Sequence, residues 1–264
     1  MVAARKLHRR AERAATGRFL VEGAKAVREA TGVRELFVTR DAAARHPELL
    51  AVASGRVSMI TERAAAALSE TVTPQGVFAV CDTVDVGLSA ALAGIPRLVA
   101  VLAGVSDPGN AGTVIRVADA AGADAVLLAG DAVDPHNGKC VRATAGSLFH
   151  LPVAVHRDTA EVIAAVRHAG LTVLAATAAG RLDLYDAPLE TPTAWLFGSE
   201  AHGLDEDALA AADHTVRVPV YGRAESLNLA TAAAVCLYAS ARAVRHAAPV
   251  AQVALPSSVV HVDE

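Results

Sequence analysis

From residue 97 to about residue 246, continuous apolar runs alternate with segments of helical spacing. Runs of the kind that is buried in a parallel sheet are found at 97–103, 125–129, 171–176, 193–198 and 215–220. Segments with helical spacing are found at 110–121, 160–168, 205–211 and 226–246. Strands that alternate with helices predict a parallel α/β domain, which we place at 97–247.

The first 90 residues have shorter segments, which predict a small α/β unit. We expect helices at 5–16, 22–31, 41–53 and 62–69, and strands at 33–38, 57–60 and 77–81. Residues 83–96 end in Gly94, Ile95 and Pro96 and are predicted to link this unit to the second domain. Residues 248–264, rich in Ala, Pro and Val, are predicted to be a loosely ordered tail.

The composition indicates a soluble globular protein and excludes a disordered one, since 53% of the 264 residues are hydrophobic. No apolar run reaches the length of a membrane span, and the N-terminus lacks the apolar stretch of a signal peptide. Cys81, Cys140 and Cys236 are far apart and form neither a metal-type pair nor a disulfide framework. We therefore expect a cytoplasmic protein with buried free thiols and no metal site.

The charge distribution suggests a nucleic-acid-binding region at the N-terminus. The formal net charge is −4, yet residues 1–28 contain eight Lys or Arg and only two Glu. A basic face on an otherwise acidic protein can bind phosphates, although a solvated helix surface explains the same pattern equally well. The candidate RNA-binding residues are Arg5, Lys6, Arg9, Arg10, Arg13 and Arg18.

Three segments with Gly or Pro beside polar side chains follow predicted strands, at 107–116, 197–204 and 218–228. Because ligands bind at the carboxyl ends of parallel strands, we expect the three segments to meet at one site. Most of their residues also have a structural explanation. Asn110 and Ser226 are typical helix N-caps, and Gly112 would permit close packing of a helix on a strand. Arg116 has no such explanation, and we expect it to share roughly one side of its helix with Asn110.

Together the three segments resemble the signature of the SpoU-type RNA ribose 2′-O-methyltransferases, members of the SPOUT superfamily. The residues that carry the resemblance are Asn110, Gly112 and Arg116, the run 197–204 and the run 226–230. Residues 143–147 resemble a connecting element of that family, and residues 19–23 and 73–76 resemble its N-terminal substrate-binding domain. Asp107, Val218 and Val220 stand where the family usually has Asn, Ile and Met.

The resemblance implies a C-terminal SPOUT catalytic domain with a trefoil knot and a smaller N-terminal α/β domain that binds RNA. It implies S-adenosylmethionine as the methyl donor, and RNA, most of all large-subunit ribosomal RNA, as the substrate. It also implies a homodimer whose active site needs both protomers. By position, the cofactor-binding residues would be Gly198, Val218, Leu227, Ser226 and Thr177.

The catalytic residues implied by the resemblance are Arg116, Asn110, Glu200, Ser226 and Asn228. Arg116 would hold a neighbouring phosphate and stabilise the developing alkoxide, and a deprotonated Arg116 that acts as the base is the alternative. The other residues would orient the ribose and Arg116. Two alternatives remain open at this point: transfer RNA as the substrate, and an RNA-binding module that has lost catalysis. The sequence also leaves open whether methylation would serve ribosome maturation or antibiotic resistance.

Overall fold

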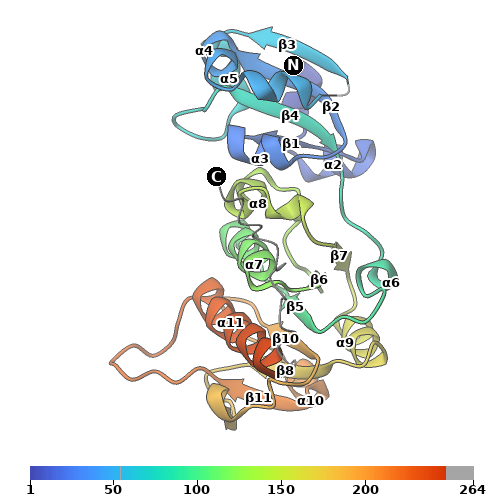
Figure 1. The fold of residues 1–264 in the computed structure, drawn as a ribbon, viewed down its shortest axis with the longest axis vertical. Coiled ribbons are helices and arrows are strands. Elements are labelled where there is room, and N and C mark those ends of the chain that lie inside the picture. Colours follow the sequence, from blue (N-terminus) through green and yellow to red (C-terminus); the bar gives the residue numbers. More distant parts are fainter. Residues whose placement is uncertain (54, 248–264) are drawn as a thin grey trace, which may run out of the picture.

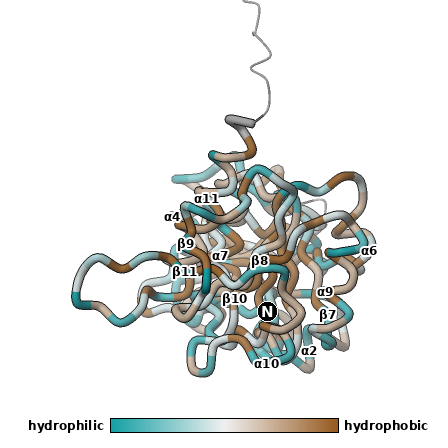
Figure 2. The backbone as a smooth tube through the Cα atoms, turned by 90° about the horizontal axis from the view of Figure 1, so that it is seen from below, coloured by the Kyte–Doolittle hydropathy of each residue, from teal (hydrophilic) through white to brown (hydrophobic). Residues whose placement is uncertain are grey.

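The computed structural model describes residues 1–53 and 55–247, which form two sheets with helices packed around them (Figure 1). Figure 2 shows the apolar stretches gathered toward the middle of the molecule. Among these residues, no helix has both the length and the apolar character needed to cross a membrane. They also contain no group of three or more His, Cys, Asp or Glu side chains that could hold a metal ion. The predicted tail, 248–264, lies outside the described residues.

The N-terminal sheet has four strands in the order β1-β4-β2-β3, antiparallel except for the β2–β3 pair. Its strands are β1 (Arg18–Glu22), β2 (Val33–Thr39), β3 (Arg56–Ile60) and β4 (Val77–Asp82). Its helices are α1 (Val2–Lys6), α2 (Arg10–Thr16), α3 (Ala24–Glu29), α4 (Arg40–Arg45), η1 (Pro47–Ala51, a 3₁₀ helix) and α5 (Glu62–Leu68). The sequence did not predict β1, which forms because Phe19, Leu20 and Val21 are all buried beside β4.

The single basic helix predicted at 5–16 is wrong, because the chain breaks between α1 and α2. Leu7 is buried in a small apolar cluster, and Arg9 has an extended backbone with φ −89° and ψ 130°. The break frees the carbonyl oxygens of Leu7 and His8, which accept hydrogen bonds from one nitrogen of Arg13 at 2.8 and 2.9 Å. A buried arginine therefore satisfies the backbone that the break exposes.

The second sheet has seven parallel strands in the order β7-β6-β5-β10-β8-β11-β9. Its strands are β5 (Leu98–Ala103), β6 (Ala125–Ala129), β7 (Val153–His156), β8 (Thr172–Ala176), β9 (Leu182–Asp183), β10 (Thr193–Phe197) and β11 (His214–Arg217). Its helices are α6 (Leu88–Ala91), α7 (Pro108–Ala121), α8 (Gly138–Thr144), η2 (Ser147–Phe149), α9 (Thr159–His168), η3 (Leu184–Asp186), α10 (Glu206–Ala211) and α11 (Leu229–Ala247). The predicted parallel α/β domain is confirmed. The trefoil knot stays a prediction.

Helices α7 and α8 pack closely because Gly112 has no side chain. A Cβ atom at Gly112 would lie 2.4 Å from the carbonyl oxygen of Cys140 and 2.7 Å from the Cβ of Ala143. The expectation that Gly112 packs against a strand is therefore wrong, since its neighbour is helix α8. This contact sets the spacing between the helix that carries Asn110 and the helix that faces the N-terminal sheet.

The two sheets are joined by charged side chains and by a continuous apolar core. The Arg13 guanidinium donates to Asp134 from Nε and from one terminal nitrogen, at 2.8 and 2.6 Å. Arg142 on α8 lies 3.2 Å from Glu22 at the end of β1, and His150 lies 3.3 Å from Glu29 on α3. Buried residues from both sheets belong to one cluster, so the junction is part of the hydrophobic core.

Candidate active site

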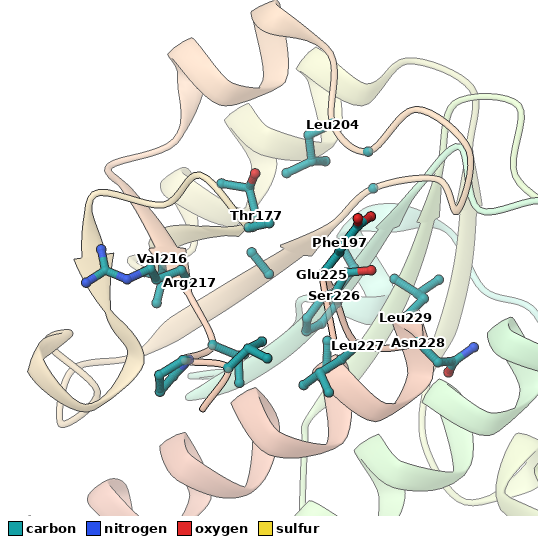
Figure 3. A pocket seen from close by; sticks show the side chains of 18 of the residues that line it. Thr177, Phe197, Leu204, Val216, Arg217, Glu225, Ser226, Leu227, Asn228 and Leu229 are labelled. Carbon is teal, nitrogen blue, oxygen red and sulfur yellow. The ribbon is translucent and has the colours of Figure 1, made fainter. Parts of the chain in front are cut away.

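A cavity of about 870 Å³ lies at the carboxyl ends of β8, β10 and β11, beside the start of α11. In Figure 3, Thr177 and Leu204 lie on one side of this space, and the labelled residues from Glu225 to Leu229 lie on the other. All five residues predicted to bind the cofactor line the cavity: Gly198, Val218, Leu227, Ser226 and Thr177. Two of the three predicted segments, 197–204 and 218–228, therefore meet at this cavity, while the binding role of each residue stays a prediction.

The turn after β10 requires glycine at position 198 because the backbone of the turn leaves no room for a side chain there. A Cβ atom at Gly198 would lie 2.2 Å from the carbonyl carbon of Gly203 and 2.4 Å from the nitrogen of Leu204. Ser199 and Gly203 exchange backbone hydrogen bonds across this turn, at 3.0 and 2.9 Å. A larger residue at 198 would open the turn and move both Glu200 and the cavity wall.

Asn228 begins the last helix and reaches toward α7. Its Oδ1 accepts hydrogen bonds from the backbone N–H groups of Ala230 and Thr231, at 2.9 and 3.3 Å. Its Nδ2 donates to Oδ1 of Asn110 at 3.1 Å. The N-cap is therefore Asn228, not Ser226, and the helix begins at Leu229 instead of at 226. Ser226 is free of that role and lines the cavity.

Asn110 in turn forms a hydrogen bond with Glu200. Its Nδ2 donates to Oε1 of Glu200 at 2.9 Å, and the backbone N–H groups of Ser106 and Asp107 each approach the same carboxylate at 3.4 Å. Partial burial alone would raise the pKa of Glu200. The hydrogen bonds, above all the one from Asn110, outweigh burial and lower the pKa below its usual value.

An ionised Glu200 fixes the direction of the whole network. A carboxylate only accepts hydrogen bonds, so the amide of Asn110 must turn its nitrogen toward Glu200 and its oxygen toward Asn228. Asn228 must then turn its nitrogen toward Asn110. We call these three side chains the Asn110–Glu200–Asn228 network, and it joins all three predicted segments.

Asp107 and Lys139 support the start of α7, and sequence reasoning missed Lys139. Asp107, not Asn110 as expected, caps the helix by accepting from the Asn110 N–H at 2.8 Å. Lys139 on α8 donates to the other Asp107 oxygen at 2.6 Å and, with the Asn110 N–H, lowers the pKa of Asp107. Gly109 lies against the Lys139 chain, but nothing in the linear sequence marks that contact.

Arg116 is on α7 but does not join this network. It is exposed, it does not line the cavity, and it has no hydrogen bond or ion pair within residues 1–53 and 55–247. Six residues of α-helix rotate a side chain by about 240°, which leaves Arg116 roughly 120° around the helix from Asn110. The expectation that the two share one side is wrong.

The basic residues near the N-terminus divide into two groups. Arg5, Lys6, Arg9, Arg10 and Arg18 are exposed, although Arg9 and Arg18 lie 4.0 and 3.9 Å from Glu12 and Asp82. Arg13 is only 4% exposed, and its nitrogens are bound to Asp134 and to backbone carbonyl groups. Arg13 is therefore not accessible to RNA, and the prediction that it binds RNA is wrong.

Two family models match two different parts of the chain. Residues 97–238 match the SpoU rRNA Methylase family, and residues 2–79 match the MRM3-like substrate binding domain. The 23S rRNA (guanosine(2553)-2′-O)-methyltransferase RlmP of Bacillus subtilis is 38% identical over 238 residues, which are 89% of this chain and 92% of that protein. The 23S rRNA (uridine(2479)-2′-O)-methyltransferase of Streptomyces viridochromogenes is 39% identical over 142 residues, 52% of this chain and 50% of that protein.

Solved structures extend the similarity to the whole fold. The AdoMet-bound rRNA methyltransferase from Sinorhizobium meliloti has a TM-score of 0.81 and 31% identity, over 91% of this chain and 93% of its own. The SpoU methyltransferase AviRb from Streptomyces viridochromogenes has a TM-score of 0.82 and 29% identity, over 93% of this chain and 97% of its own.

Proposed function

The chain belongs to the SpoU rRNA methylase family, and on this premise we propose that it transfers a methyl group from S-adenosylmethionine to a ribose 2′-hydroxyl of large-subunit ribosomal RNA. The observation that carries the proposal is the Asn110–Glu200–Asn228 network beside a cavity lined by Gly198 and Leu227. Relatives named as 23S rRNA 2′-O-methyltransferases support ribosomal RNA over transfer RNA.

The cavity suits S-adenosylmethionine in size and in lining. A volume of about 870 Å³ falls in the range of small-molecule sites, and apolar residues such as Val218, Pro219 and Leu227 alternate with a few polar ones. Gly198, Val218, Ser226, Leu227 and Thr177 would hold the cofactor. When bound, it supplies a methyl group that the adjacent sulfonium makes electrophilic, so that a carbon–oxygen bond forms as the carbon–sulfur bond breaks.

The residues of the chain would position the acceptor and stabilise charge. Ser226 and the network would orient the ribose, because the amides of Asn110 and Asn228 are held in one direction by ionised Glu200. Arg116 would hold a neighbouring phosphate and stabilise the negative charge on the 2′-oxygen as its proton leaves. The guanidinium is available for this, since no described residue pairs with it.

We propose that the active enzyme is a homodimer in which Arg116 completes the site across the protomer interface. Arg116 is exposed away from the cavity of its own protomer. On the neighbouring helix α11, Tyr238 is 54% exposed, with its hydroxyl 3.5 Å from the carbonyl oxygen of Ala120 on α7. Helices α7 and α11 therefore present a joint face with an arginine and an aromatic side chain, as protein interfaces commonly do.

We assign RNA binding to an N-terminal domain, residues 1–90, and catalysis to residues 97–247, and we place the protein in the cytoplasm. The match of residues 2–79 to a substrate-binding domain supports this assignment. So do the exposed side chains of Arg5, Lys6, Arg9 and Arg10 on and beside α1 and α2. These arginines and the lysine would contact phosphates and add affinity without reading the base sequence.

The direct test is to incubate the protein with methyl-labelled S-adenosylmethionine and either ribosomal RNA, large ribosomal subunits or transfer RNA. We expect label in 23S rRNA at one nucleotide whose 3′ bond resists alkaline cleavage, since a methylated 2′-oxygen cannot attack the phosphate. Label in transfer RNA alone would overturn the substrate assignment. Cofactor binding without labelling of any RNA would favour the non-catalytic alternative.

A further inference from the structure

The charged side chains that line the cavity are more often acidic than basic. Three are acidic, Asp183, Glu200 and Glu225, and one is basic, Arg217. Arg217 lies 3.9 Å from Asp183 and donates to the carbonyl oxygen of Gly180 at 3.0 Å. The cavity thus keeps a net negative charge after the one acid–base pair is counted.

Glu225 differs from the other two acids. Asp183 lies beside Arg217, and Glu200 accepts hydrogen bonds from Asn110 and from backbone N–H groups. Within the described part of the chain, Glu225 has neither a hydrogen bond nor an ion pair. It stands directly before Ser226 on the wall opposite Thr177 (Figure 3). Its negative charge is therefore uncompensated and faces the space that a ligand would fill.

We propose that Glu225 is a specificity-determining residue that makes the cavity prefer the cationic methyl donor over its neutral, demethylated product. This inference rests on the proposed cofactor site. S-adenosylmethionine carries a positive sulfonium, whereas S-adenosylhomocysteine, left after methyl transfer, has an uncharged thioether. The two ligands share the adenosine and the amino-acid end and differ in the charge of the sulfur. An uncompensated carboxylate would therefore bind the charged ligand more tightly than the neutral one.

The expected size of the effect follows from the exposure of Glu225. The side chain is exposed, so water screens its charge and the interior value of the Coulomb energy does not apply. Two unit charges about 4 Å apart in water attract enough to change a dissociation constant by roughly five-fold. Discrimination of that size favours loading of fresh donor and release of product, because both compete for the same cavity.

The test measures dissociation constants of S-adenosylmethionine and S-adenosylhomocysteine by titration calorimetry, with the full-length protein and without RNA. In Glu225→Gln, which keeps the shape of the side chain, we expect affinity for S-adenosylmethionine to fall by roughly five-fold while affinity for S-adenosylhomocysteine stays unchanged. Glu225→Asp should retain most of the preference. Glu190→Gln removes an exposed carboxylate that does not line the cavity and should leave both constants at the wild-type values.

Salt gives a second measurement on the same proteins. Raising the salt concentration from about 0.05 M to about 0.5 M should reduce the preference of the wild type and have little effect on Glu225→Gln, because ions screen an exposed charge. An unchanged ratio of the two constants in Glu225→Gln, or an equal loss for both ligands, would overturn the inference alone. Failure of the wild type to bind either ligand would instead overturn the proposed function.

Discussion

The junction between the two sheets and the exposed face of α7 each present an arginine that sequence reasoning assigned to RNA. Arg13 is 4% exposed and its guanidinium is surrounded by acceptors from the protein, chiefly Asp134. Arg116 is exposed and no described residue pairs with it. An arginine is therefore available to an external anion only where the fold supplies no anion of its own.

The two arginines also differ in whether a carboxylate lies beside them. Burial alone would raise the pKa of Asp134, but hydrogen bonds from His136 and Arg13 outweigh it and hold that pKa far below its usual value. Asp134 is thus a permanent anion facing Arg13 inside the molecule. No carboxylate of the described residues takes that place beside Arg116, which leaves its guanidinium available to an external anion.

The largest expected effect is on stability. Arg13→Ala should lower the free energy of unfolding by about 3–5 kcal/mol, because it removes the guanidinium partner of the charged Asp134 and frees two backbone carbonyl groups. Urea denaturation of the full-length protein measures this. Arg10→Ala, an exposed arginine on the same helix, is the matched control and should change little. Equal stability of the two variants would show that the junction does not depend on Arg13.

Arg116→Ala should act in the opposite way, on catalysis and not on folding. Methyl transfer should slow by about 10²- to 10³-fold, the usual loss when one charge-stabilising donor is removed, while the urea midpoint and cofactor affinity stay at the wild-type values. Single-turnover assays measure this. Normal turnover would contradict the proposed role of Arg116.

The Arg116→Ala variant also tests the proposed homodimer. Glu200→Gln removes the carboxylate of the network and should also slow methyl transfer. If Arg116 acts across the interface, mixing Arg116→Ala with Glu200→Gln should raise activity above that of either variant, because one of the two sites in a mixed dimer has both native residues. Mixtures that are no more active than the variants after subunit exchange would place Arg116 and Glu200 of one protomer in the same site.

The smallest expected effect concerns His150, between the two sheets. The hydrogen bond to Asp119 raises the pKa of His150, burial partly offsets this, and Glu29 adds to the rise. A raised pKa in the folded state adds stability that is fully present below about pH 6.5 and is lost as the pH rises through the folded-state value. Urea midpoints of wild type and His150→Gln should therefore differ at about pH 5 and converge at about pH 9. A difference independent of pH would point to packing instead.

The sequence predicts the parts of the fold that depend on continuous burial. The runs at 97–103, 125–129 and 193–198 correspond to β5, β6 and β10, because central parallel strands are apolar on both faces. The prediction lacks the strands β1, β7 and β9 and the helix α8, although β1 is as long as β6 and α8 is longer than α10. Their existence depends on partners far along the chain, such as β4 for β1.

For the site, sequence reasoning brings the correct loops together but misplaces single side chains. It takes Asn110 and Ser226 as helix caps, whereas Asp107 and Asn228 fill those positions. A shift of two or three residues in a helix start cannot be read from residue preferences, since Asn, Asp and Ser cap almost equally well. The ion pairs of Lys139 and Arg13 are decided by tertiary contacts over 32 and 121 residues of chain, which no local pattern reports.

Asn228 uses the two ends of one amide for two different tasks. An aspartate would cap α11 equally well and would place a favourable negative charge at the positive end of a long helix. It could not donate to Asn110, and it would set a second anion close to Glu200. Helix stability alone would thus accept either residue or favour the acid, whereas the direction of the hydrogen bonds in the Asn110–Glu200–Asn228 network admits only the neutral one. The amide at this position is therefore explained by the hydrogen bond to Asn110 and not by the stability of α11.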